Sequence, residues 1–153
     1  YGIPQFENNH GSDENTWCLG SQYWSRTPHV SNYNARFGIL LNMVGAKNST
    51  FYKEGISMQY APSIVKKVWS AAKKIGFESY FIDENGGYVT DDHLPVNEIA
   101  RIPCIDIINC DMNSELSSFG DAWHTVNDNM NVIDKNTLRA VGQTVLQVIY
   151  NEK

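Results

Sequence analysis

The chain has 153 residues, of which 42% are hydrophobic and 19% are charged, a composition that is typical of one folded domain and excludes an intrinsically disordered chain. Its formal net charge of −5, with no lysine or arginine run longer than two residues, argues against nucleic-acid binding. No apolar run approaches the roughly 18 residues that a membrane-spanning helix requires.

The first predicted elements are a loop, a short helix and a strand. Residues 1–14 are polar and rich in turn residues, so we expect a loop there. Residues 15–26 carry Asn15 or Thr16 as a helix cap and several aromatic side chains, which predicts a short helix. Residues 37–44 form a nearly continuous apolar run. Such a run favours a strand covered on both faces, as in a parallel sheet.

The clearest helix signal covers residues 60–76. Pro62 suits its first turn, and Gly76 suits its C-terminal end. The apolar positions of this segment fall on one stripe, namely Ile64, Val65, Val68, Trp69, Ala72 and Ile75. A strand predicted at residues 79–83 completes a strand–helix–strand unit with residues 37–44, for which a right-handed crossover is expected.

The second half of the chain continues the alternation of helices and strands. Residues 93–100 predict a short helix, residues 102–109 a buried strand, and residues 110–131 a long loop. The last helix is predicted over residues 134–152, with Asp134 as its N-cap. Its expected buried stripe consists of Leu138, Val141, Val145, Val148 and Ile149. This order predicts an α/β fold of three layers, with a mainly parallel sheet between helices.

Polar clusters follow the predicted strands. The "TDDH" stretch comes after the strand at residues 79–83, and "WHTVNDN" comes after the strand at residues 102–109. Asn42 lies near the end of the first strand. In open α/β sheets, ligands bind beyond the carboxyl ends of the strands. We therefore expect these clusters to converge on one active site at a single edge of the sheet.

The residue types in these clusters indicate metal and proton chemistry. His124 is the best candidate for a metal ligand, because imidazole is the commonest such ligand; a hydrogen-bonded structural histidine is the alternative. Asp91 and Asp92 are candidates for a proton-transfer pair, since adjacent acids in a desolvated cleft push their pKa values apart. Alternatively, one of them caps the helix that begins near His93. Trp123 is a candidate for the wall of a substrate pocket.

The absence of several known motifs argues against other classes of enzyme. No GxSxG elbow, GxGxxG fingerprint or phosphate-binding loop occurs, which argues against a serine hydrolase and against a nucleotide-dependent enzyme. His10 and His29 are expected to be solvated loop residues. The three cysteines show no CxxC spacing, and we expect Cys104 and Cys110 to be buried thiols.

Several stretches together carry a family resemblance. They are "LGSQYW", "GILLNMVGAKNSTFYKEG", "GGYVTDDHLPVN", "IPCIDII", "WHTVNDN" and "DKNTLRAVGQTVLQVIYNE". These resemble the zinc-dependent M28 peptidase superfamily, and most of all its bacterial glutaminyl-peptide cyclotransferase branch, known from Bacteroides-type bacteria. The resemblance runs from about residue 17 to the end. It implies that residues 1–153 are the C-terminal part of a single zinc exopeptidase-like domain that lacks its N-terminal part.

The resemblance implies a reaction and roles for three residues. The implied enzyme uses zinc to convert the N-terminal glutamine of a peptide into pyroglutamate, with release of ammonia, and it is extracytoplasmic. By the same resemblance His124 is a zinc ligand, Trp123 lines the pocket for the glutamine side chain, and Asp91 belongs to the catalytic hydrogen-bond network. The family's acidic zinc ligands and general-base glutamate are expected upstream of Tyr1.

One departure from the family pattern keeps alternatives open. Asn42 stands where the family usually has an aspartate, and an amide cannot replace a carboxylate in a proton relay. An M28-type metallo-aminopeptidase is the first alternative, although Asn42 weighs against its second zinc ion. A catalytically inactive fragment or binding module with the same fold is the second. A half-sheet also leaves an unpaired strand edge, through which we expect association with another chain.

Overall fold

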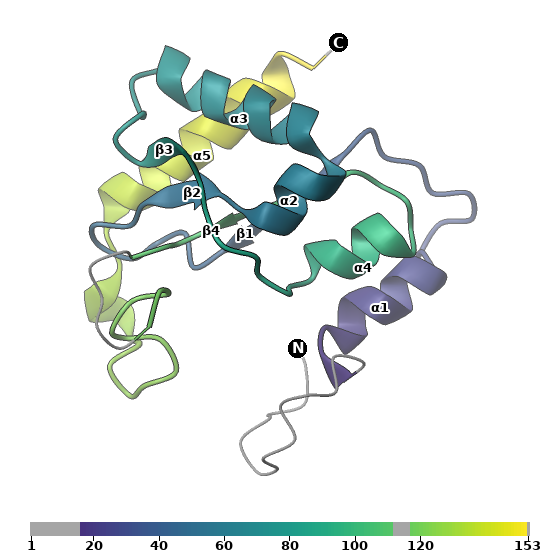
Figure 1. The fold of residues 1–153 in the computed structure, drawn as a ribbon, viewed down its shortest axis with the longest axis horizontal. Coiled ribbons are helices and arrows are strands. Elements are labelled where there is room, and N and C mark those ends of the chain that lie inside the picture. Colours follow the sequence, from purple (N-terminus) through teal and green to yellow (C-terminus); the bar gives the residue numbers. More distant parts are fainter. Residues whose placement is uncertain (1–15, 112–116, 153) are drawn as a thin grey trace.

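The structure, a computed structural model, describes residues 16–111 and 117–152. Its strands are β1 (Gly38–Asn42), β2 (Phe51–Lys53), β3 (Phe81–Asn85) and β4 (Cys104–Ile108). Its helices are α1 (Leu19–Arg26), α2 (Gly55–Tyr60), α3 (Pro62–Lys74), α4 (His93–Glu98), the 3-10 turn η2 (Met130–Val132) and α5 (Lys135–Tyr150). In Figure 1 the strands lie between α3 and α5 on one side and α1 and α4 on the other. The predicted α/β architecture of parallel strands between helices is confirmed.

The strands form two parallel pairs. β1 pairs with β4, in a register that places Asn42 opposite Ile108, and β2 pairs with β3. An antiparallel bridge between Phe51 and Asn109 links the two pairs. The predicted strand–helix–strand unit is therefore wrong in its partners, because the strand after α3 pairs with β2 rather than with β1. β2 spans only Phe51–Lys53, too short a stretch to show the alternation by which a half-buried strand is predicted.

The two central strands differ in how well they are covered. β4 is buried along its whole length, as predicted for residues 102–109. β1 is only partly covered, contrary to the prediction, and Leu41 is 45% exposed. Within residues 16–111 and 117–152, β1 pairs with β4 alone. The apolar sequence of β1 thus matches a strand whose second edge is left open by the described part of the chain.

Helix α3 confirms the clearest sequence prediction. It begins at Pro62, and Gly76 follows its C-cap with a φ of +85°, a left-handed conformation that glycine adopts without strain. The predicted stripe is buried with the exception of Ile75, which is half-buried. The ring of Trp69 meets Phe81 edge-on at 5.3 Å between centroids, and its indole nitrogen donates to the Ile82 carbonyl at 2.8 Å. This side chain therefore anchors α3 to β3.

Helix α5 confirms its predicted cap but not its whole predicted stripe. The Asp134 Oδ1 atom accepts the backbone N–H of Asn136 at 3.1 Å. Leu138 and Ile149 were expected inside and are 44% and 55% exposed. The helix instead buries mostly small side chains, which are Thr137, Ala140, Val141, Thr144 and Val148. A stripe read from the sequence fits more than one helix face, and packing against α3 selects the face with the smaller residues.

Helix α1 begins later than predicted. It starts at Leu19, and Cys18 occupies its N-cap with a φ of 55° and no capping side-chain bond. Thr16 is therefore not the cap, while Asn15 and His10 lie outside the described residues. His29 is exposed as expected.

The cysteines are thiols, as predicted, although only one of the two expected inside is fully buried. Cys18, Cys104 and Cys110 form no disulfide with one another. Cys104 is buried, whereas Cys110 is half-buried. Its place just after β4, where the chain leaves the sheet, accounts for the difference.

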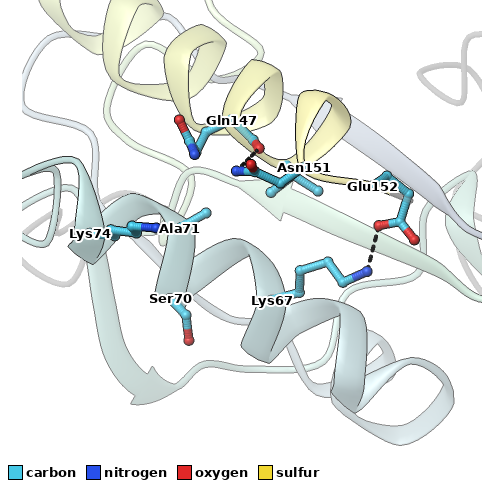
Figure 2. A pocket seen from close by; sticks show the side chains of 8 residues that line it. Lys67, Ser70, Ala71, Lys74, Gln147, Asn151 and Glu152 are labelled. Atoms are coloured by element: carbon cyan, nitrogen blue, oxygen red, sulfur yellow. Dashed lines mark hydrogen bonds and ion pairs between the residues drawn. The ribbon is translucent and has the colours of Figure 1, made fainter.

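A groove between α3 and the C-terminal end of α5 is lined mainly by polar and charged residues. Lys67 forms an ion pair with Glu152 across it at 2.5 Å, and the Asn151 side chain donates to the Gln147 carbonyl at 2.7 Å (Figure 2). Exposed ion pairs of this kind contribute little stability. The groove lies between helices rather than at the strand ends, so it is distinct from the predicted site.

Candidate active site

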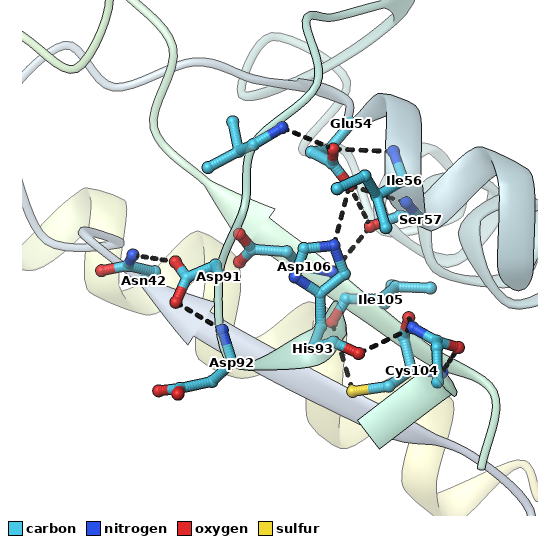
Figure 3. A network of polar contacts seen from close by, with 12 residues as sticks. Asn42, Glu54, Ile56, Ser57, Asp91, Asp92, His93, Cys104, Ile105 and Asp106 are labelled. Atoms are coloured by element: carbon cyan, nitrogen blue, oxygen red, sulfur yellow. Dashed lines mark hydrogen bonds and ion pairs between the residues drawn. The ribbon is translucent and has the colours of Figure 1, made fainter. Parts of the chain in front are cut away.

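Asn42 and Asp91 form the centre of the candidate site. Asn42 Nδ2 donates a hydrogen bond to Asp91 Oδ2 at 2.5 Å, although 49 residues separate them in the sequence. Asn42 is the last residue of β1, and Asp91 lies just before α4. Both side chains are half-buried. The structure therefore brings these two predicted site residues together at the carboxyl end of β1 (Figure 3).

The side chains of Asp92 and His93 contact residues other than Asn42. Asp92 Oδ1 accepts the Ser21 hydroxyl at 2.8 Å, which ties α1 to the site. Asp92 occupies the N-cap position of α4, but its side chain makes no capping bond. The Asp92 side chain is therefore not the cap, whereas Asp91 Oδ1 accepts the backbone N–H of Asp92 at 2.7 Å at the start of this helix. His93 is fully buried, and its Nε2 atom lies 3.1 Å from Glu54 Oε2.

Trp123 and His124 form a second pair in the loop between β4 and α5. Their rings stack with centroids 3.8 Å apart and an interplanar angle of 18°, and the Phe119 ring packs on Trp123 at 5.0 Å. Both side chains are exposed. His124 has a φ of 57°, a left-handed conformation that non-glycine residues rarely adopt. Backbone strain of this kind is concentrated at functional sites.

The loop that carries the second pair is anchored to the segment that follows β1. The backbone N–H of Lys47 donates to the Val132 carbonyl at 2.9 Å, and that of Asp134 donates to the Gly45 carbonyl at 2.8 Å. An antiparallel bridge between residues 46 and 133 lies between these bonds. Trp123 and His124 therefore belong to the segment that follows β4, and this segment is tied to the one that follows Asn42 at the end of β1. Asp91 belongs to a third segment, which follows β3.

A buried acid, Glu54, lies next to His93 and Ser57 (Figure 3). Its side chain is 2% exposed. Desolvation acts to raise its pKa, but hydrogen bonds from His93, Ser57 and Ile56 outweigh that effect and lower the pKa to about 2. Glu54 is therefore ionised at neutral pH. A buried carboxylate of this kind is stable only because its oxygens are fully hydrogen-bonded.

A second buried acid, Asp106, has the opposite character. It lies in β4 with 1% of its surface exposed, and neither carboxyl oxygen has a hydrogen-bond partner among the described residues. Burial, reinforced by the nearby charges of Asp91, Glu54 and Asp92, raises its pKa to about 9. Asp106 is therefore protonated at neutral pH, and the site holds one charged and one neutral buried acid.

The acids make this part of the molecule attractive to cations. The thiol of Cys18 and the carboxylates of Asp91 and Asp92 have ligand atoms within 4.8 Å of one another. Burial of the thiol and the two carboxylates raise the Cys18 pKa to about 12, so the sulfur is protonated. A group of negative charges attracts ligands of the opposite sign, such as a metal ion.

The described residues do not complete a zinc site around His124. Among residues 16–111 and 117–152, the acidic group of Cys18, Asp91 and Asp92 is the set of three metal-ligating side chains close enough to hold an ion, and His124 is not part of it. Stable zinc sites have three or four protein ligands. A zinc ion at His124 therefore requires ligands beyond those that this part of the chain brings together.

Sequence reasoning missed the two buried acids. The signal for Asp106 was available, since an acid inside the apolar run at residues 102–109 must either find a partner or keep its proton. Glu54 gave no such signal, because it stands between Lys53 and Gly55 in a stretch that looks like an exposed turn.

Known structures resemble this chain closely. A Bacteroides thetaiotaomicron glutaminyl cyclase bound to N-acetylhistamine is 63% identical with a TM-score of 0.91, over 100% of this chain and 51% of that chain. A leucine aminopeptidase precursor from the same organism is 62% identical with a TM-score of 0.89, over 100% of this chain and 50% of that one. A Zn-dependent exopeptidase from Parabacteroides distasonis is 53% identical with a TM-score of 0.90, over 99% of this chain and 51% of that chain.

These matches fix the family, although the chain spans about half the length of the structures it matches. The comparison with curated proteins finds no match. The sequence profile of peptidase family M28 covers residues 10–149, which is most of the sequence and includes all four predicted site residues. The chain belongs to peptidase family M28.

Proposed function

We propose that this chain supplies part of the active site of an enzyme that cyclises the N-terminal glutamine of peptides to pyroglutamate. The observation that carries the proposal is the 63% identity, across the whole chain, to a structure named a glutaminyl cyclase. In this reaction the α-amine nitrogen bonds to the γ-carbonyl carbon, the bond from that carbon to the amide nitrogen breaks, and a proton passes from the amine to the departing ammonia. Nucleophile and electrophile belong to one substrate, so much of the catalysis is positioning.

The chain's own residues suit particular tasks in this reaction. Asp91 presents a carboxylate held by Asn42, and it would accept a hydrogen bond from the reacting nitrogen atoms. The surrounding acids would attract the N-terminal ammonium group. Trp123, with its exposed ring stacked on His124, would form an apolar wall for the glutamine side chain.

Zinc is the proposed cofactor, with His124 as a ligand. The family and the exopeptidase named as Zn-dependent support this, and the missing ligands would come from the part of the relatives that this chain does not span. Bound zinc would act as a Lewis acid toward the γ-carbonyl oxygen. We propose an extracytoplasmic location, because one relative is named a precursor. No helix in the described residues is long and apolar enough to cross a membrane.

The test is a chimera in which this chain follows the first half of the Bacteroides thetaiotaomicron glutaminyl cyclase. It should release ammonia from a peptide with N-terminal glutamine, and not from the same peptide with N-terminal asparagine, whose shorter side chain places the carbonyl wrongly for a five-membered ring. Asp91→Asn should remove most of the activity, while Asp83→Asn, on the exposed part of β3, should not. A soluble, folded chimera that binds zinc and releases no ammonia would refute the proposal.

The aminopeptidase alternative rests on the relative named a leucine aminopeptidase precursor. Hydrolysis of leucine p-nitroanilide by the same chimera would favour it. Asn42 argues against this activity, because an amide is a weaker ligand than a carboxylate for a second zinc ion. Inactivity toward both substrates would favour the inactive fragment or binding module.

A further inference from the structure

We infer that Glu54 is a positioning residue, which fixes the place of Asp91 by holding the chain on both sides of it. The structural part of this inference concerns the position of Asp91 relative to Asn42. Its catalytic consequence rests on the proposed function.

One carboxylate holds both flanks of the Asp91 segment. Glu54 Oε1 accepts the backbone N–H of Val89 at 3.0 Å, and Glu54 Oε2 lies 3.1 Å from His93 Nε2. Val89 and His93 are each two residues from Asp91, on opposite sides of it. Because a carboxylate only accepts hydrogen bonds, the shared proton belongs to the histidine nitrogen. The intervening segment is therefore pinned at both ends to a single buried group.

We call the contacts of Glu54 with Val89 and His93 the clamp. The clamp is held in place by the buried core. Glu54 and His93 are 2% and 0% exposed. Helix α4, which begins at His93, is held to β4 by Asn97, whose side chain donates to the Cys104 carbonyl at 2.7 Å and accepts the Cys104 N–H at 2.9 Å. The same amide group donates to the His93 carbonyl at 2.8 Å. Movement of His93 would therefore break bonds within the buried core.

The clamp reaches Asp91 through a short segment. Asp91 Oδ1 accepts the backbone N–H of Asp92 at 2.7 Å, and Asp91 Oδ2 accepts Asn42 Nδ2 at 2.5 Å. The first bond fixes the carboxylate against its own backbone, and the backbone is fixed by Glu54. The Asn42 contact therefore depends on a residue that touches neither partner.

A purely structural role for Glu54 has a different signature. Glu54 also caps α2, since its oxygens accept the N–H groups of Ile56 at 2.7 Å and Ser57 at 2.6 Å. If capping were its whole role, loss of Glu54 would loosen α2 and leave Asp91 in place. The two roles separate by substitution, because His93 belongs to the clamp alone. The Ser57 hydroxyl donates to Glu54 Oε2 at 2.7 Å and accepts the backbone N–H of Asp106 at 2.9 Å, so it ties Glu54 to α2 and β4 and not to the Asp91 segment.

The first readout is the side-chain amide of Asn42 in the chimera, observed by ¹⁵N–¹H NMR and assigned by its loss in Asn42→Asp. Its short bond to Asp91 should shift one amide proton downfield in the parent protein. Glu54→Ala and His93→Phe should each abolish that shift. His93→Gln, which can still donate to Glu54, should restore much of it, and Ser57→Ala should leave it unchanged. Circular dichroism checks that each variant is folded, and the two His93 variants decide the matter if Glu54→Ala does not fold.

Two outcomes of this readout would overturn the inference. One is an Asn42 signal that is unchanged in both folded clamp variants, because Asp91 would then be positioned without Glu54. The other is an equal loss of the signal in Ser57→Ala, because the capping of α2 would then be the property that matters.

The second readout is cyclisation, and it separates this inference from the proposed function. A misplacement of about 1 Å costs on the order of 100-fold in rate, so Glu54→Ala and His93→Phe should lower kcat by about that factor with a smaller change in KM. A lost Asn42 signal with unchanged kcat supports the positioning by Glu54 and overturns the proposed role of Asp91. A parent chimera without cyclase activity overturns the proposed function, and the NMR readout still decides the positioning.

Discussion

The protonated state of Asp106 should make the stability of this protein fall as the pH rises. Its carboxyl group is 1% exposed and has no hydrogen-bond partner among the described residues, and its pKa is raised from 3.8 to about 9. Between these two values the folded chain keeps a proton that the unfolded chain has released. The folded state therefore binds more protons, and the free energy of unfolding decreases with increasing pH throughout that window.

The magnitude follows from the linkage relation. Each pH unit within the window costs about 1.4 kcal/mol, so roughly 4 kcal/mol is lost between pH 4 and pH 7. Asp106→Asn has nearly the same shape and cannot ionise. At pH 4 the two folded proteins differ only in having an amide or a neutral carboxyl group at this position. At higher pH the free energy of unfolding of the variant should exceed that of the parent by the full amount that the linkage relation gives.

Urea unfolding followed by tryptophan fluorescence measures this difference, with the buried Trp69 as the main reporter. Asp83→Asn is the control, since this exposed acid has its pKa lowered by its hydrogen bond to Lys53. Asp83 contributes stability that is present above its unfolded pKa and lost at acid pH, so its replacement should act in the opposite direction. A stability difference between Asp106→Asn and the parent that stays within about 1 kcal/mol from pH 4 to pH 8 would refute the reasoning, because a shift of even one pKa unit exceeds it.

Three further predictions concern the site and the sheet edge. Asn42→Asp should place two carboxylates in the 2.5 Å contact, so that they share a proton and the pKa of one of them rises. Cyclase assays of the chimera across pH should then show a higher kcat. An unchanged kcat would mean that Asp91 works without an acidic partner. His124→Ala should abolish zinc binding by the chimera, as measured by metal content, whereas the control His29→Ala should retain it; full zinc content in the first variant would rule out the ligand role. We also propose that the open edge of β1 makes the 153-residue chain associate, which sizing with light scattering tests, and a cooperative monomer would contradict it.

The sequence by itself determined the elements whose energies are local. The apolar stripe of α3 predicts this helix, together with Pro62 and Gly76 at its ends. The capping residue Asp134 predicts the start of α5. These signals depend on contacts between residues that are close in the sequence, so they can be recognised from the sequence alone. The sequence of β4, which is apolar apart from Asp106, likewise predicts a buried strand. The polar clusters after the strands predict a site at a sheet edge, because the carboxyl ends of parallel strands lie at the same edge.

Only the tertiary structure decided which groups in the site meet and in what state of charge. Asn42 and Asp91 come from segments 49 residues apart, and no local pattern states that they touch. Glu54 and Asp106 are acids of nearly the same chemistry, yet one has its pKa lowered to about 2 and the other has it raised to about 9. The difference arises because one carboxylate receives several hydrogen bonds and the other receives none from the described residues. The free energy of a buried charge depends on the donors that long-range packing brings to it, and that packing is a property of the fold.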